Sequence, residues 1–258
     1  MTEELLKQIA KNTSPKESYQ IVVSSNQNDF DTLFNPNITL DRNKRYEIAL
    51  VNLETYYSFP NIDSSNNVLN YSKDSGATWK TITIPEGSYE ITDINIAVQT
   101  AMKLNGDWDS ANSKYYITIG ANLNTLKSTL EITNTTYRVD FNVASSISSV
   151  LGFNKQVYSA SYQESENVVN ILSINSILVN IDIISGSFLK GTRAPVIYSF
   201  FPSVSPGYKI IENPVNLVYL PVELKQIHRL RTSITDQDGK LLNLRNETLI
   251  IRFHLRQA

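Results

Sequence analysis

Runs of branched and aromatic residues, separated by turn residues, fill the C-terminal part of the sequence from residue 170 onwards. Such runs are typical of β-strands, because these side chains pack well on a pleated sheet. They occupy residues 171–184, 196–201, 217–222 and 248–255. Prolines and glycines separate the runs, and Asp238-Gly239 is the strongest hairpin signal in the chain. The pattern predicts antiparallel strands that form a sandwich or a barrel.

The N-terminal part has the same character. Strands are predicted at residues 19–25, about 30–40, and 45–59. The last of them places Tyr46, Ile48 and Leu50 at alternate positions, which is the period of a strand with one buried face. Residues 61–74 are polar, with serines and asparagines in succession, and indicate a surface crossing or a domain boundary.

Helix signals occur in the middle of the chain. Residues 94–104 carry hydrophobic residues at helical spacing, follow a capping residue at Thr92 or Asp93, and end at Asn105-Gly106. A second, shorter helix is predicted at 145–151, before Gly152. Strands are predicted at 79–84, 115–119 and 129–141. This part of the chain is therefore expected to be an α+β unit inserted in a β framework.

The strand count outside the insertion favours one architecture. Three strands precede the insertion, and five are predicted after it, at 170–185, 194–204, 215–222, 227–236 and 247–257. Eight strands in two sheets are the count of a jelly roll. The predicted fold class is all-β, an eight-stranded single jelly roll, that is a two-sheet sandwich, with a helix-containing α+β insertion. The expected division is an N-terminal arm (1–16), the first part of the roll (17–62), the insertion (63–163) and the second part of the roll (164–258).

The N-terminal arm has a one-sided hydrophobic face made by Leu5, Leu6 and Ile9. Acidic residues precede basic ones, which suits a helix dipole, and the pattern stops at Ser14-Pro15. A helix of about two turns is too short to be stable alone. The segment is either a frayed terminus or an arm that docks on a neighbouring subunit, with these three residues as its contacts.

Composition narrows the function. The 258 residues are 41% hydrophobic, and 23 basic residues against 25 acidic ones leave a formal charge of −2. No global field attracts nucleic acid or anionic lipid, so no direct sequence-specific nucleic-acid partner is expected. The arginine pairs 229/231 and 252/256 each share a strand face and are expected on solvated or subunit-contacting surfaces rather than in phosphate clamps. No hydrophobic run is long enough to span a membrane, and there is no cysteine.

The sequence contains few residue patterns that are typical of catalytic or metal-binding sites. Neither His228 nor His254 has a carboxylate at a ligand-like spacing. The glycines of 186–192 lack the lysine of a phosphate-binding loop, and a hairpin or an inter-sheet loop explains them better. Residues 236–239 lack the glutamate of a calcium loop, and a hairpin closed by Asp238-Gly239 explains them better. The prediction is a chain without catalytic, metal-binding or cofactor-binding residues and without a cofactor. An enzyme would have to build its site from Asp, Glu and Tyr alone.

One short segment is a candidate ligand or attachment platform. Asp107 and Asp109 flank Trp108, which combines a stacking surface for a sugar ring with polar hydrogen-bonding groups. Aromatic residues beside loop acids also occur without any ligand. The chain has 14 tyrosines, which fill cores and sheet edges but are also enriched at protein interfaces.

Three segments together resemble a known family. They are ITDQDGKLLNLRNETLIIRFHLR at 234–256, PEGSYEITDINIAVQTAM at 85–102 and SISSVLGF at 146–153. They are similar to the end and the middle of the penton, or minor capsid, proteins of polinton-like viruses, virophages and Maverick/Polinton elements. The resemblance covers residue 17 to the end, and its motifs are structural rather than catalytic.

The resemblance implies a structural role in the virion, made in the infected host cell. A single jelly roll would stand upright in an icosahedral shell, and a homopentamer would close each vertex among trimers of a double jelly-roll major capsid protein. A host surface receptor or glycan is a candidate further partner. The alternative hypothesis is a β-sandwich carbohydrate-binding or host-attachment module.

Overall fold

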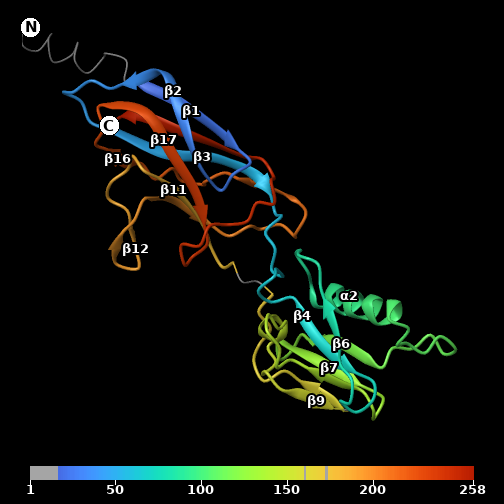
Figure 1. The fold of residues 1–258 in the computed structure, drawn as a ribbon. Helices are drawn as coiled ribbons and strands as arrows, with labels where there is room; N and C mark the ends of the chain where they lie inside the picture. The colour runs from blue at the N-terminus through green and yellow to red at the C-terminus, as the bar shows by residue number, and fades with distance from the viewer. Residues whose placement is uncertain (1–16, 160, 172–173) are drawn as a thin grey trace, which may run out of the picture. The chain divides into compact units, whose positions relative to one another are not determined.

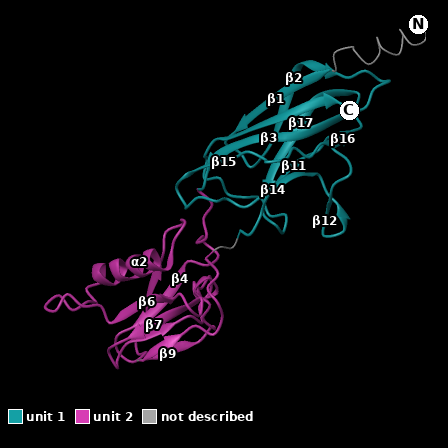
Figure 2. Ribbon diagram, turned by 180° about the vertical axis from the view of Figure 1, so that it is seen from behind, with its two compact units in different colours: residues 1–57, 174–258 teal, residues 58–173 magenta. Residues whose placement is uncertain are grey.

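The structure is a computed structural model that describes residues 17–159, 161–171 and 174–258. The fold is all-β with antiparallel sheets, and the chain divides into two compact units (Figure 2). The described residues through Tyr57 form the first unit together with Ile174–Ala258, and those of Ser58–Ser173 form the second. The predicted arm residues Leu5, Leu6 and Ile9 lie outside the described residues.

The first unit is a sandwich of two sheets (Figure 1). One sheet contains β1 (Ser18–Ser25), β18 (Leu249–Gln257), β3 (Tyr46–Tyr56), β15 (Lys209–Glu212) and β16 (Leu220–Val222). The other contains β14 (Val196–Phe200), β11 (Ile177–Ile181), β17 (Gln226–Thr235) and β2 (Asp29–Thr39). The order is β1-β18-β3-β15 in the first sheet and β14-β11-β17-β2 in the second. Since β15 and β16 pair with opposite ends of β3, they share one strand position, and each sheet has four positions.

The connections make this sandwich a jelly roll. Apart from the step between β11 and β14, each connection along the roll leads from one sheet to the other. A small hairpin, β12 (Phe188–Leu189) and β13 (Thr192–Arg193), lies within that one step. The eight-stranded roll predicted from the sequence is thus the observed fold, with the inserted unit between its third and fourth strand positions.

Alternation of buried and exposed residues builds the core of the roll. In β18 the residues at odd positions from Leu249 to Leu255 are buried, and the even ones are half-buried on the outer face. Ile21 and Val23 on β1 continue the buried set across the sheet. Because side chains alternate along a strand, this period of two directs one face of each strand inwards.

The second unit has its own hydrophobic core between two small sheets and a helix. One sheet contains β5 (Lys80–Thr83), β4 (Val68–Ser72), β8 (Arg138–Asp140) and β9 (Val157–Ser159), and the other β10 (Tyr162–Glu164), β7 (Lys127–Ile132) and β6 (Ile117–Asn122). The helix α2 (Ile91–Leu104) buries Ile91, Ile94, Val98 and Met102, and α3 (Ser148–Leu151) ends at Gly152. Whether residues 63–163 fold as an independent domain stays a prediction.

Several predicted elements differ from the observed ones. The predicted strand 129–141 is two strands in different sheets, β7 and β8, because the Asn134 side chain organises a turn between them. The polar segment 61–74 contains β4, whose Leu69 and Tyr71 are buried. The predicted cap of α2 was also wrong: Glu90 caps the helix, and the Asp93 carboxylate accepts the Glu90 N–H at 3.0 Å.

The two hairpin predictions are confirmed. The Asp236 carboxylate accepts the N–H groups of Asp238 and Lys240, and Gly239 takes a positive φ of 83° in the turn. Residues 188–193 form the β12-β13 hairpin, with Gly191 at its tip.

Candidate functional site

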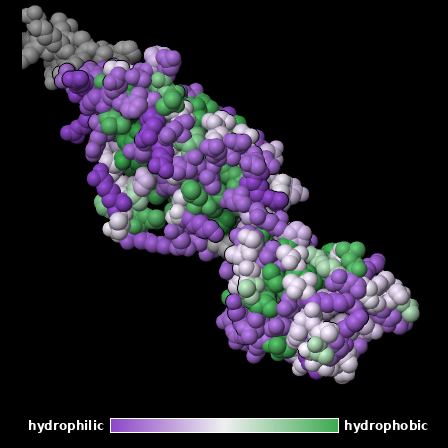
Figure 3. All heavy atoms as spheres, viewed as in Figure 1, coloured by the Kyte–Doolittle hydropathy of each residue, from purple (hydrophilic) through white to green (hydrophobic). Residues whose placement is uncertain are grey.

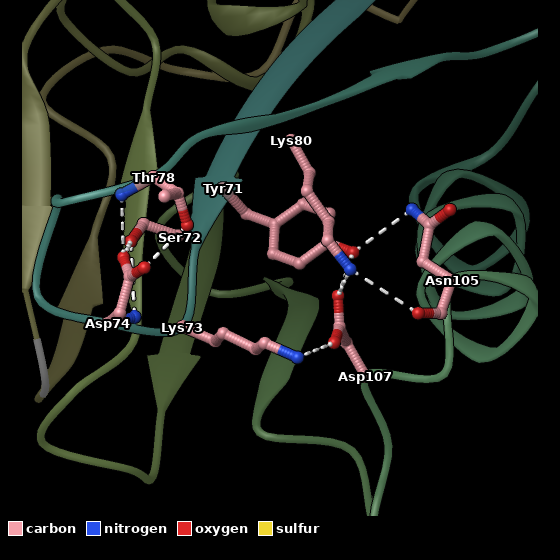
Figure 4. Close-up of polar contacts among 8 residues, drawn as sticks. All are labelled: Tyr71, Ser72, Lys73, Asp74, Thr78, Lys80, Asn105 and Asp107. Carbon is pink, nitrogen blue, oxygen red and sulfur yellow. Dashed lines mark hydrogen bonds and ion pairs between the residues drawn. The ribbon is translucent and has the colours of Figure 1, made fainter.

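A buried carboxylate just after α2 organises a cluster of ionisable groups in the second unit (Figure 4). Asp107 follows the helix, and its side chain is 0% exposed. The Tyr71 hydroxyl on β4 donates to Asp107 Oδ2 at 2.7 Å, and Lys73 Nζ donates to Oδ1 at 2.7 Å. Lys80 on β5 contacts Oδ2 as well, and Asn105 donates to the Tyr71 hydroxyl at 3.0 Å. The carboxylate therefore has partners on both oxygens, from β4, from the residue that follows β4, and from β5.

The electrostatics of this cluster keep each group in its ordinary charge state. Burial raises the pKa of Asp107, but the hydrogen bonds from Lys73, Lys80 and Tyr71 outweigh it and hold the pKa below its usual range. Burial, followed by the hydrogen bond to Asp107, raises the pKa of Tyr71. At neutral pH the carboxylate stays charged and the phenol stays protonated. This arrangement suits a structural brace rather than a group that exchanges protons.

A neighbouring turn is fixed in the same manner. The Asp74 carboxylate accepts hydrogen bonds from Ser72 Oγ at 2.7 Å and from the N–H of Thr78 at 2.8 Å (Figure 4). These bonds, with the Thr78 hydroxyl contributing most, lower the pKa of Asp74 to about 2. The connection between β4 and β5 is thereby held in place beside Lys73 and Lys80.

The predicted platform residues do not form one continuous surface. Trp108 is half-buried, with the Tyr115 ring stacked at a centroid distance of 5.8 Å and Lys103 Nζ 4.5 Å from its ring centroid. The Asp109 carboxylate accepts the backbone N–H and the side-chain amide of Asn112. Asp107 is turned inward, as described above. Ligand binding by Trp108 stays a prediction, and its neighbours are engaged within the fold.

Sequence reasoning missed Tyr71, Lys73 and Lys80. Tyr71 and Lys80 are direct partners in the β4-β5 pairing, so the two strands bring them together. A prediction of β4 would have placed Tyr71 and Lys80 side by side. The segment is short and polar, so its sequence does not show the pattern of a strand.

On the roll, Arg252 and Arg256, four residues apart on one face of β18, are paired across the sheet. Arg252 donates to Glu54 at 2.5 Å and also contacts Asn52, and Arg256 donates to Glu47 at 2.8 Å. Hydrogen bonds from Lys209, then Arg252, lower the pKa of Glu54 to about 2. The outer face of this sheet therefore carries basic and acidic side chains that are paired across neighbouring strands.

The second arginine pair behaves alike on β17. Arg231 holds Asp29 with two hydrogen bonds of 2.9 and 2.6 Å, and Arg229 donates to Asp182 at 3.0 Å. Both pairs therefore lie on strand faces, as predicted, with acidic partners that occupy their guanidinium groups. His254 hydrogen-bonds to Ser18 and Tyr219.

The roll also exposes hydrophobic residues at one sheet edge. Residues 213–219, named here the edge loop, connect β15 to β16 at the edge of the sheet next to β3. In this loop Val215 is 97% and Val218 61% exposed, and Ile211 on β15 is exposed beside it. On the face drawn in Figure 3, hydrophobic and hydrophilic side chains are interspersed over the units.

Within residues 17–159, 161–171 and 174–258, no helix is both long and apolar enough to cross a membrane. In that same part of the chain, His, Asp and Glu residues do not gather in threes as metal ligands would.

Comparison with known proteins identifies the fold. No family model matches the sequence, and no curated protein matches it. Among solved structures, the chain is similar to the penton protein of mavirus, with 12% identity, a TM-score of 0.52, and coverage of 95% of this chain and 100% of that one. The chain also matches the D2-D3 domains of the flagellar cap protein FliD from Escherichia coli, with 12% identity, a TM-score of 0.16, and coverage of 84% of this chain and 100% of that one. The chain has a penton-like jelly-roll fold, as the resemblance predicted.

Proposed function

We propose that the chain is a structural minor capsid protein of a virion, forming homopentamers at the vertices of an icosahedral shell. The observation that carries the proposal is the likeness to the mavirus penton protein over nearly the whole of both chains. That likeness includes the second unit as well as the roll, because 95% coverage cannot be reached without both. A protein that acts by shape also needs no reactive group, and the ionisable cluster around Asp107 is saturated by internal partners.

A vertex subunit needs two different surfaces that fit each other, because a five-fold ring is closed by heterologous contacts. The edge loop is our candidate for one of them. Exposed aliphatic side chains that gather at one place on a surface commonly mark protein contacts. Val215, Val218 and Ile211 present such a group beside the paired charges of β3 and β18. The neighbouring copy in the same five-fold ring would bury this hydrophobic group.

Further partners follow from the same role. The double jelly-roll major capsid protein would surround each pentamer, with residues 1–16 as the connecting arm through Leu5, Leu6 and Ile9. A host receptor or glycan would be contacted by whichever surface faces outwards. The alternative function, carbohydrate binding by a platform at Trp108, is tested by glycan binding to the Trp108→Ala variant.

The deciding experiment measures assembly. Native mass spectrometry and negative-stain images of the purified full-length protein, alone and mixed with its major capsid protein, are expected to show rings of five or five-fold density in particles. Val215→Asp with Val218→Asp should reduce ring formation. Leu123→Asp with Leu126→Asp, which changes two exposed leucines of the second unit, is the matched control. A protein that stays monomeric at all concentrations and never enters particles would overturn the proposal.

A further inference from the structure

A polar cleft opens at one end of the jelly roll. Residues 26–29, in the turn from β1 to β2, form one wall, and residues 243–246, in the connection from β17 to β18, form the other. Its volume is about 340 Å³, within the range of pockets that hold small ligands. All of these residues belong to the first unit, so the cleft depends on the roll alone.

The lining offers amide groups and almost no apolar surface. The side chains of Asn26, Gln27 and Asn246 make no hydrogen bond to any other described residue, so their donors and acceptors are available. Each amide carries two donors and a carbonyl acceptor. Leu244 is the one aliphatic residue of the lining, and it is buried. A ligand that fits these walls has many hydroxyl-type groups and little hydrocarbon to bury.

One positive charge remains uncompensated in the cleft. Asp29 also lines it, but Arg231 neutralises that carboxylate through two hydrogen bonds of 2.9 and 2.6 Å. Arg245 is exposed, and its guanidinium has no acidic partner in the part of the chain that is described. A free guanidinium binds carboxylates in a two-pronged geometry. The cleft therefore favours a ligand with a single negative charge.

The wall that carries Arg245 has an unusual backbone. Arg245 and the next residue, Asn246, both have left-handed conformations, with φ of 50° and 62°. Such conformations cost free energy for residues other than glycine and concentrate at sites that hold ligands. The Asn243 side chain accepts the Arg245 N–H at 3.0 Å and keeps this strained turn in shape. The arginine is thus presented by a fixed loop.

We propose that this cleft binds a carboxylated sugar, such as a sialic acid or a uronic acid residue. Arg245 would hold the carboxylate, and the amides of Asn26, Gln27 and Asn246 would bond to the hydroxyl groups. A phosphate would call for more than one cation, and an acidic peptide would present apolar groups that these walls cannot cover. The site differs from the segment around Trp108, which lies in the other unit.

The proposal does not require vertex placement, since one subunit contains the whole cleft.

The test is titration of the full-length protein with N-acetylneuraminic acid and with glucuronic acid, followed by saturation-transfer NMR and calorimetry. Saturable binding is expected. Arg245→Gln, which removes a charged hydrogen bond, should weaken it by roughly tenfold or more. Arg42→Gln, which changes an exposed arginine in the turn after β2, should leave binding unchanged. Glucose, which lacks the carboxylate of glucuronic acid, should bind roughly tenfold more weakly than that acid.

Several outcomes would overturn the proposal: no saturable binding of either acid, equal binding by Arg245→Gln and the unmodified protein, or tighter binding of inorganic phosphate or a diglutamate peptide. Thermal unfolding of each variant verifies the fold. Gln27→Ala changes the opposite wall without touching the strained turn. It should also weaken binding of both acids, and unchanged binding in this variant would contradict the proposed contacts.

Discussion

Replacing Asp107 with alanine tests whether the buried carboxylate braces the second unit. The Tyr71 side chain is fully buried, and its hydroxyl would lose its acceptor, which costs about 1–3 kcal/mol. Lys73 and Lys80 are 51% and 38% exposed and can turn to water, so each lost ion pair adds only about 0.5 kcal/mol. The expected loss in the free energy of unfolding is about 3 kcal/mol. Asp107→Asn, which keeps the shape and one acceptor, should lose about 2 kcal/mol.

The acid dependence of this loss follows from the pKa of Asp107, which the fold lowers. A group with a lowered pKa stabilises the fold fully above its pKa in the unfolded chain, about 4, and loses this contribution as the pH falls through the folded value. The difference in stability between the unmodified protein and Asp107→Asn should be constant between about pH 5 and 8. It should shrink below about pH 4.

Tryptophan fluorescence makes the measurement specific. The chain has two tryptophans, Trp79 and Trp108, and both lie in the second unit, so their emission during urea unfolding reports this unit alone. Glu131→Ala, an exposed acid on β7, is the control and should change stability by less than about 0.5 kcal/mol. A loss below about 1 kcal/mol for Asp107→Ala, or an equal loss for the control, would refute the bracing role.

Three other predictions concern the backbone, the paired charges on the outer face of the roll and the arm. Gly152→Ala should destabilise the second unit by about 3 kcal/mol in the same fluorescence assay, because its new Cβ would lie 2.4 Å from the Asn167 carbonyl oxygen. Gly106→Ala, with open space around it and a similar positive φ, should cost only about 1–2 kcal/mol. Equal losses in the two variants would contradict the steric argument. The unmodified roll should lose stability as the pH falls from about 4 towards 2, because the charged Glu54 carboxylate stabilises it and is protonated in this range. Glu54→Gln should lose less stability over the same range. Thermal melting followed by circular dichroism checks this, and a pH profile equal to that of the unmodified protein would contradict it. Deleting residues 1–14 should leave the melting temperature unchanged and reduce incorporation into shells, whereas normal incorporation would show the segment to be passive.

The jelly roll could be predicted because its strands are long and alternate clearly. β18 buries every second residue over its length, and the hairpin at Asp238-Gly239 has the residues that such a turn requires. Short strands carry too few positions for the same signal. β4 has only five residues, with an asparagine between its two buried hydrophobic side chains, and β15 has four after a turn. Local sequence cannot distinguish such segments from loops.

The candidate sites were harder to predict because they join residues that are distant in sequence. The Asp107 brace needs β4, β5 and the end of α2 in place, and the polar cleft needs the turn after β1 beside a loop more than two hundred residues later. The sequence around Asp107 contains no pattern that predicts its contacts with Lys73 and Lys80. Trp108 attracted attention because its neighbours in sequence are acids, although these acids are engaged elsewhere in the fold.

The position of β18 has a consequence for biosynthesis. β18 follows the other described strands of the roll in the sequence and is synthesised after them, yet it lies between β1 and β3 and pairs with both along its length. β1 and β3 therefore cannot complete their pairing in this sheet until β18 has been made. A premature stop codon just before Leu249 would delete an interior strand of the sheet rather than an edge strand, and β1 would lose its pairing strand.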